Sequence, residues 1–325
     1  MNRIGIDVGG TFIKGGIIDN KGNILFSTKV PTFNNNEKIS VVDNLYNLIN
    51  YLLEKSKSIS DVTPSFIGLG IPGIVNRKKG LAEFSGNLSW NNVPIIELLK
   101  EKGINIPMKI CNDSRSACIG EMMFGAGVKY KNAVVMTIGT GIGAGIVING
   151  KLFEGNGDKG GEIGHSLLMM DGELCTCGRQ GCFEAYASAK ALIRYTKEEL
   201  LYNKNSLMWN HVYGEIENVD GALAFTYAKL GDKSANNVIN KYVKYLSEGI
   251  LNICNCFRPE VIIIGGGISE AGDFLFEKIN AYIAERNYGY KCTPPVNVIQ
   301  AKLGNSAGMI GAAFMNEFLK DDDNE

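Results

Sequence analysis

The sequence predicts a two-domain α/β protein, and three observations lead to this fold class. The chain of 325 residues is long enough for two domains that each bury a core. Short apolar strands alternate along it with longer helical segments. A glycine-rich hairpin occurs twice, at Asp7–Lys14 and at Thr137–Gly145, once in each half. An internal repeat of this kind is more specific than either copy alone, so we expect two related domains.

The first hairpin has the residue types of a phosphate site. A buried strand at Ile4–Val8 runs into a glycine turn, and a second strand follows from Phe12. Backbone N–H groups and a hydroxyl in such a turn can cradle phosphate oxygens, while a carboxylate can hold the water shell of Mg²⁺. The candidate nucleotide residues here are Asp7, Gly9, Gly10, Thr11 and Lys14. Taken alone this hairpin is weak evidence, because many such turns bind nothing.

The second half contains two further glycine turns. A strand at Ala133–Ile138 leads into the second hairpin, whose candidate nucleotide residues are Thr137, Gly139, Thr140 and Gly141. Two such hairpins could hold a triphosphate between them. A strand at Val261–Ile264 ends in Gly265, Gly266 and Gly267, which permits close approach of adenine and ribose. An ordinary strand-to-helix turn is the alternative for this last glycine run.

Helices and strands between these turns are expected to form the cores. Apolar residues at helical spacing predict a core-facing helix at Lys38–Lys57, and a buried strand is predicted at Ser65–Ile71. Further helices are predicted at 189–201, 221–230, 234–257 and 307–319, the last packing on the first domain. Asn87 lies in a predicted loop beside Trp90, where it could contact a sugar or simply form a turn.

A strand at Met108–Cys111 delivers Asn112 and Asp113 to the start of a helix predicted at Ser116–Phe124. An aspartate at a helix start is by default a cap. The alternative is a functional role for Asp113, which the second glycine hairpin soon after it favours.

A cysteine-rich segment predicts a metal site. Cys175, Cys177 and Cys182 are separated by glycines, and His165 lies just upstream. Three thiolates and an imidazole suit tetrahedral Zn²⁺ with a closed shell, which makes the ion structural rather than catalytic. Reduced cysteines can also be small core residues, and we expect this of the other five. Glu162 and Glu184 bracket the ligand set, so a metal would fix two carboxylates that can bind sugar hydroxyls.

Charge and hydropathy exclude several classes. The 33 basic and 34 acidic residues balance, which speaks against a nucleic-acid partner or a membrane surface. No apolar run reaches the ~18 residues of a membrane span, and Met1 leads almost directly into a strand, leaving no room for a signal peptide. A cytoplasmic protein with reduced thiols is expected. The acidic end at Asp321–Glu325 is predicted to be disordered.

Together these motifs resemble the ROK family of sugar kinases and sugar-responsive repressors. The resemblance covers essentially the whole chain and rests on Asp7-x-Gly-Gly-Thr-x-x-Lys14, Asn112-Asp113, Thr137-x-Gly-Thr-Gly, Glu162-x-x-His165, Cys175-x-Cys-Gly-x-x-Gly-Cys-x-Glu184 and Gly265-Gly-Gly. It implies the two-domain actin-like or hexokinase-like fold, a duplicated ribonuclease H-like ATPase architecture. The expected division is a small domain of residues 1–114 plus 307–320 and a large domain of 115–306 with the zinc loop.

The resemblance also implies the function. Asp113 is expected to be the catalytic base, and the sugar hydroxyls are expected to bind Asn87, Asn112, Asp113, Glu162, His165 and Glu184. ATP, Mg²⁺ and structural Zn²⁺ are the expected cofactors, and a homodimer is the expected assembly. We expect phosphoryl transfer to the 6-OH of glucose, as in bacterial glucokinases of the family.

Two alternatives stay open: an N-acetylmannosamine or N-acetylglucosamine kinase, and a non-catalytic sugar-binding regulator. One departure is visible, because Ser114-Arg115 stands where family glucokinases commonly have Ala-Asn. It leaves the surroundings of Arg115 to be explained.

Overall fold

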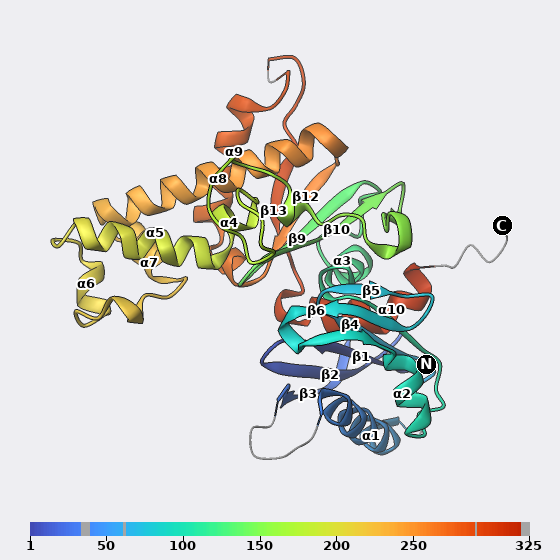
Figure 1. Ribbon diagram of the computed structural model, residues 1–325. Coiled ribbons are helices and arrows are strands. Elements are labelled where there is room, and N and C mark those ends of the chain that lie inside the picture. The colour runs from blue at the N-terminus through green and yellow to red at the C-terminus, as the bar shows by residue number, and fades with distance from the viewer. Residues whose placement is uncertain (34–39, 61–62, 290, 320–325) are drawn as a thin grey trace. The chain divides into compact units, whose positions relative to one another are not determined.

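The computed structural model describes residues 1–33, 40–60, 63–289 and 291–319 (Figure 1). The chain forms two units. Unit 1 contains the described residues of Met1–Lys131, Gly145–Gly161 and the stretch from Lys302 onward, and unit 2 contains Asn132–Ala144 and Glu162–Ala301. The chain therefore passes between the units four times. This division differs from the expected one, since residues 115–131 and 145–161 belong to unit 1. The acidic end at 321–325 lies outside the described residues.

Unit 1 is built on a five-stranded mixed sheet. In spatial order its strands are β3 (Ile24–Pro31), β2 (Phe12–Ile18), β1 (Arg3–Val8), β4 (Ile67–Ile71) and β8 (Met108–Asn112). The first three strands pair antiparallel, whereas β1, β4 and β8 run parallel. The carboxyl ends of three strands thus meet at one edge of the sheet, where α/β proteins bind ligands.

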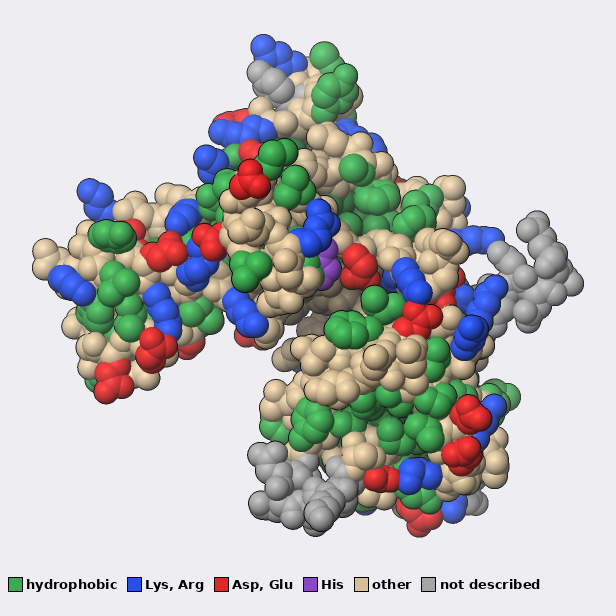
Figure 2. Space-filling view, viewed as in Figure 1, with side chains coloured by type: hydrophobic (Ala, Val, Ile, Leu, Met, Phe, Trp, Pro, Cys, Tyr) green, Lys and Arg blue, Asp and Glu red, His purple; other side chains and the backbone are tan. Residues whose placement is uncertain are grey.

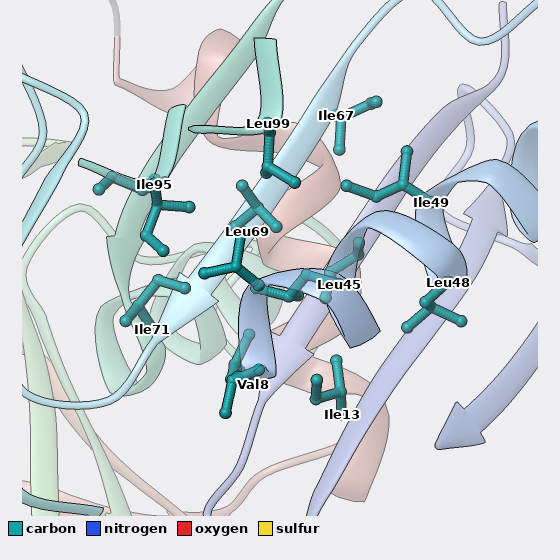
Figure 3. Close-up of a cluster of buried hydrophobic side chains, with 14 of the residues drawn as sticks. Val8, Ile13, Leu45, Leu48, Ile49, Ile67, Leu69, Ile71, Ile95 and Leu99 are labelled. Atoms are coloured by element: carbon teal, nitrogen blue, oxygen red, sulfur yellow. The ribbon is translucent and has the colours of Figure 1, made fainter. Parts of the chain in front are cut away.

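Two helices cover opposite faces of this sheet. A Cβ at Gly15 of β2 would touch Leu48 and Leu52 of α1 (Val41–Ser60), whereas one at Gly16 would meet Met309 of α10 (Ala307–Phe318). Successive strand residues point to opposite faces, so the two helices lie on either side. The apolar stripe predicted for the first long helix is buried on α1, and side chains from β1, β2, β4, α1 and α2 (Ile95–Glu101) converge with it in Figure 3.

The last helix packs closely on α3 (Asp113–Phe124) within unit 1, as its small residues allow. A Cβ on Gly311 of α10 would lie 1.7 Å from the Ser116 carbonyl oxygen of α3, so only glycine permits this approach. The structure starts α3 at Asp113, earlier than the predicted Ser116. A small antiparallel sheet of β5 (Ile74–Asn76), β6 (Leu81–Ser85) and β7 (Trp90–Val93) also belongs to this unit. The short β11 (Lys151–Leu152) lies in unit 1 as well and pairs antiparallel with β10 (Ile142–Ile148).

A second five-stranded sheet repeats the strand order of the first. The second five-stranded sheet has the order β11-β10-β9-β12-β13, which corresponds strand for strand to β3-β2-β1-β4-β8. β9 (Ala133–Ile138), β12 (Val261–Gly265) and β13 (Asn297–Gln300) run parallel, and β10 (Ile142–Ile148) begins in unit 2 and continues into unit 1. The predicted internal repeat is therefore visible in the fold.

Helices make up most of the rest of unit 2. They are α4 (Glu184–Ala187), α5 (Ala189–Tyr202), α6 (Met208–His211), α7 (Leu223–Lys229), α8 (Lys233–Phe257) and α9 (Asp273–Arg286). Residues 162–183, which we call the cysteine loop, contain only a 3₁₀ turn at Ile163–His165 and the isolated bridges Leu167–Cys182 and Leu174–Gln180. No helix of the described residues is long and apolar enough to cross a membrane. On the face shown in Figure 2, acidic and basic side chains are interspersed.

Candidate functional site

In unit 1 the candidate residues gather at the carboxyl ends of parallel strands. Asp7 of β1 pairs in register with Gly70 of β4, and Gly70 pairs with Cys111 of β8. Asn112 and Asp113 follow at once, and the first glycine hairpin follows β1. The structure thus brings the predicted base and the first phosphate-type turn to one edge of one sheet.

The cap of α3 is Asn112, not Asp113. Its Oδ1 accepts hydrogen bonds from the backbone N–H groups of Ser114 (3.0 Å) and Arg115 (3.1 Å), and its Nδ2 donates to the Gly73 carbonyl (3.1 Å). The Asp113 carboxylate accepts from the Ser114 N–H at 2.7 Å, which orients it at the first turn. Because Asn112 does the capping, the default explanation for an aspartate here does not account for Asp113.

The first hairpin places a carboxylate and an amine together. Burial raises the pKa of Asp7, and the positive charge of Lys14 across the β1–β2 pair opposes that rise. Thr11 and Gly10 at the turn are exposed. A Cβ on Gly10 would lie 3.6 Å from the Asn87 Cβ, so Asn87 is beside this turn. Asn87 lies in a 3₁₀ turn (Gly86–Leu88) rather than in the loop predicted from the sequence.

Unit 2 holds the other two glycine turns side by side. Thr137 at the end of β9 pairs in register with Gly265 at the end of β12. Gly266 requires glycine, because its φ is +83° and a Cβ there would lie 2.4 Å from the Ile138 carbonyl oxygen. Gly139 and Gly267 have nothing within 4 Å of a Cβ, which leaves room for a ligand to approach their backbone.

A cavity of about 620 Å³ opens beside this third glycine turn. Its walls come from the 3₁₀ turn after β12, from α7 and from the start of α5, and include Phe225, Thr226, Lys229, Ile268 and Glu270. Gly267 lines it as well. Sequence reasoning found only the glycine, since the other walls are scattered residues without a motif. A mostly apolar hollow with a few polar groups is the usual form of a small-molecule pocket.

The predicted metal ligands form a compact cluster. The ligand atoms of His165, Cys175, Cys177 and Cys182 all lie within 4.8 Å of one another. The Cys175 sulfur is 3.6 Å from His165 Nδ1, and the sulfurs of Cys177 and Cys182 are 3.6 Å apart. Tetrahedral zinc, with bonds of about 2.3 Å to sulfur and about 2.0 Å to nitrogen, keeps its ligand atoms roughly 3.5–3.8 Å apart. The donor set and its spacing fit this ion, and they leave Nε2 of His165 for another partner.

The other cysteines differ from expectation in part. Cys111, Cys118 and Cys254 are buried, as expected of packing residues, and burial raises the pKa of each thiol. Cys256 and Cys292 are exposed, so their interpretation as packing residues is wrong. Cys256 lies near the end of α8 and Cys292 lies in a turn, and the polar neighbours Asn255, Lys291 and Thr293 are the sequence signal that could have indicated exposure.

Glu184 links the cysteine loop to the second hairpin. One carboxylate oxygen accepts from the Ile142 N–H (2.9 Å) of the hairpin, and the other accepts from the Thr176 hydroxyl (2.7 Å). A Cβ on Gly141 would lie 2.4 Å from this carboxylate, so Gly141 is small because Glu184 occupies the space. The sequence suggested neither contact. Glu184 is buried, whereas the other candidate carboxylate, Glu162, is exposed.

Comparison with known proteins decides the family. The profile of the ROK family matches residues 3–317, which is nearly the whole chain. This chain belongs to the ROK family. A glucokinase of Thermotoga maritima is 35% identical over 320 residues, which cover 96% of this chain and 96% of that protein. The crystal structure of a ROK family glucokinase from Streptomyces griseus, in complex with glucose and AMPPNP, is similar with a TM-score of 0.83 at 30% identity, covering 97% of this chain and 99% of that one.

Regulators of the same family are similar too. A xylose repressor of Caldicellulosiruptor bescii is 30% identical over 290 residues, which cover 88% of this ROK protein but 70% of the repressor. The two-domain actin-like or hexokinase-like fold expected from the sequence is confirmed by the likeness to ROK glucokinase structures. The glucokinase relatives support the expected class of sugar kinase. The xylose repressor shows that the family also contains regulators.

Proposed function

We propose that this ROK protein is an ATP-dependent hexose kinase that transfers the γ-phosphoryl group of ATP to the 6-OH of glucose. The observation that carries the proposal is the position of the candidate residues. Asp7 and Asn112-Asp113 lie at the carboxyl ends of parallel strands of one sheet, and Thr137 and Gly265 lie at the carboxyl ends of parallel strands of a second sheet with the same strand order. A kinase needs a base and phosphate-holding turns, and both sets occupy the strand ends where such folds bind ligands.

Asp113 is the proposed general base. Its carboxylate accepts the proton of the sugar O6 as the bond from O6 to the γ-phosphorus forms and the bond from that phosphorus to the β-phosphate oxygen breaks, so ADP leaves. The Ser114 N–H holds one carboxylate oxygen, which leaves the group oriented. Asn87, Asn112, Glu162, His165 and Glu184 are the proposed partners of the sugar hydroxyls.

The glycine turns and the cavity form the proposed nucleotide site. The turns at Gly9–Thr11 and Gly139–Gly141 offer backbone N–H groups to phosphate oxygens, and Lys14 adds a positive charge. The cavity beside Gly267 suits adenine and ribose, with Phe225 and Ile268 for the base. Mg²⁺ bound to ATP neutralises phosphate charge, and the Asp7 carboxylate is the group of this chain that would hold its water shell.

We also propose that His165, Cys175, Cys177 and Cys182 hold a structural Zn²⁺. When bound, the ion would cross-link these four side chains. The four ligand residues would keep the cysteine loop folded, so that His165 Nε2 and the nearby carboxylates can bind the sugar.

An ADP-release assay with ATP and Mg²⁺ tests the proposal. Glucose, mannose, fructose, allose, N-acetylmannosamine and N-acetylglucosamine are compared by kcat/KM, with zinc content measured on the same protein. The highest kcat/KM for glucose is expected. A preference for an N-acetylhexosamine would replace the substrate, and turnover of no sugar by zinc-loaded protein would sink the kinase proposal.

A sugar-binding regulator is the second candidate because xylose repressors are relatives at 30% identity. Two measurements on the same zinc-loaded protein, sugar binding and ADP release, distinguish the two functions. A regulator would bind a sugar in calorimetry without releasing ADP, whereas the kinase shows both.

A further inference from the structure

Arg115 carries a buried charge that the proposed reaction does not use. It lies on α3 two residues beyond Asp113 and is only 4% exposed. Its Nη1 donates to the Asp158 carbonyl oxygen at 2.7 Å, and its Nη2 donates to the Gly160 carbonyl oxygen. A buried guanidinium is costly unless it is hydrogen-bonded, so these two carbonyls are a specific arrangement rather than incidental contacts.

The carbonyls belong to a segment that leads directly into the cysteine loop. Gly160 is followed by Gly161, whose φ is +81°, and then by Glu162 of the Glu162-x-x-His165 motif. Gly161 is also the last residue of unit 1 before the chain enters unit 2. Arg115 therefore holds the peptide that directly precedes the Glu162–His165 turn. This turn carries two of the proposed sugar ligands.

Other residues of unit 1 anchor the same segment further upstream. The Arg77 N–H donates to the Asp158 carboxylate (2.9 Å), the Arg77 guanidinium pairs with Glu154 (2.8 Å), and Lys159 pairs with Glu83 (2.6 Å). None of these contacts involves the carbonyl of Gly160. Arg115 differs from them because it holds the last peptide before the crossing.

We propose that Arg115 is a positioning residue for sugar binding, which fixes the departure point of the Glu162–His165 turn through the Asp158 and Gly160 carbonyls. The proposal rests on the proposed function, since it assigns Glu162 and His165 to the sugar. The planar guanidinium can satisfy two carbonyls at once in a fixed geometry. A lysine offers a single nitrogen on a flexible stem, so it keeps the charge but not the paired contact.

The test compares Arg115→Lys and Arg115→Met with the control variant Arg77→Met, which loses the Glu154 pair but keeps its own backbone bond to Asp158. The KM for glucose is expected to rise roughly tenfold in both Arg115 variants, because a displacement of about 1 Å in a positioning group can cost up to about 100-fold. The KM for ATP and the zinc content are expected to stay unchanged. The control is expected to keep the glucose KM of the native protein.

Amide hydrogen exchange over residues 158–165 gives a readout that is independent of activity. Exchange there is expected to be faster in both Arg115 variants than in the native protein and the control. If the native protein phosphorylates no sugar, the function fails while this exchange result still decides the positioning role. Unchanged exchange and unchanged glucose KM in Arg115→Lys would overturn the proposal. An equal rise of the glucose and ATP KM values would show a general structural role and overturn it too. Should Arg115→Met fail to fold, Arg115→Lys carries the test alone.

Discussion

The strand–helix junction at residues 108–124 and the cysteine loop at residues 162–183 both carry proposed sugar ligands, but they are held in different ways. The junction is fixed by strand register, by the Asn112 cap and by close packing of α3 on α10. The cysteine loop has one 3₁₀ turn, two isolated bridges and the four clustered ligand atoms. The junction is held by a sheet ladder and by helix packing, whereas the backbone hydrogen bonds of the cysteine loop are turn and isolated-bridge contacts, to which the cluster of ligand side chains is added. Their responses to mutation should therefore differ in kind.

The largest effect is expected at the junction. Asp113→Asn removes the proposed base but leaves the fold, because the cap of α3 belongs to Asn112. We expect kcat to fall about 10²–10⁴-fold with the glucose Kd unchanged. Steady-state kinetics and calorimetry measure the two quantities. Asp273→Asn, the same change at the exposed first residue of α9, is the control, and turnover retained in Asp113→Asn would remove Asp113 as the base.

A smaller but broader effect is expected in the cysteine loop. Cys177→Ser removes one proposed zinc ligand, so bound zinc should fall and the glucose Kd should rise roughly 10–100-fold, the usual range for disturbing the support of a site. Cys256→Ser, an exposed cysteine on α8 outside the cluster, is the matched control. Elemental analysis and calorimetry measure both outcomes. Native glucose affinity in a zinc-free variant would show that the loop is held without metal.

A third prediction concerns Glu184, which links the cysteine loop to the second hairpin. Thr176→Val removes the hydroxyl that donates to Glu184 at 2.7 Å but leaves the Ile142 bond in place. A lost hydrogen bond of about 1 kcal/mol corresponds to a roughly fivefold weaker affinity, and we expect this for glucose with zinc retained. Thr63→Val, an exposed threonine of unit 1, is the control. An effect on ATP alone would assign Glu184 to the nucleotide hairpin rather than to the sugar.

The same contrast explains what the sequence could predict. The repeat, the strands, the metal ligands and the family followed from local motifs such as the spacing of Cys175, Cys177 and Cys182. The start of α3 was misplaced because Asn112 caps through its own side chain and extends the helix backward. The contacts of Arg115 and Glu184 join residues that are 45 and 42 positions apart, and no local pattern encodes such pairs. The cavity beside Gly267 was missed for the same reason.

A substitution of Asp7, the carboxylate at the end of β1, is expected to raise the stability of the protein rather than to weaken it. Burial raises its pKa above the ordinary 3.8, and Lys14 only partly offsets this. Between the unfolded and the folded pKa the folded protein binds more protons, so stability falls as pH rises through that window and stays lower above it. Asp7→Asn removes a buried carboxyl group whose ionised form is disfavoured by burial. We therefore expect the variant to be more stable at pH 7 without ligand, and the advantage to shrink toward pH 4.

Chemical denaturation of both proteins at several pH values measures this difference, and MgATP provides the control. Because the ionised carboxylate is the form that suits Mg²⁺, MgATP should stabilise the native protein more than Asp7→Asn. The variant should thus gain stability while losing activity, as residues tuned for binding commonly do. Cys177→Ser should lose both. A stability loss in Asp7→Asn at neutral pH would mean that the Asp7 charge is paired in the folded protein, and it would overturn this expectation.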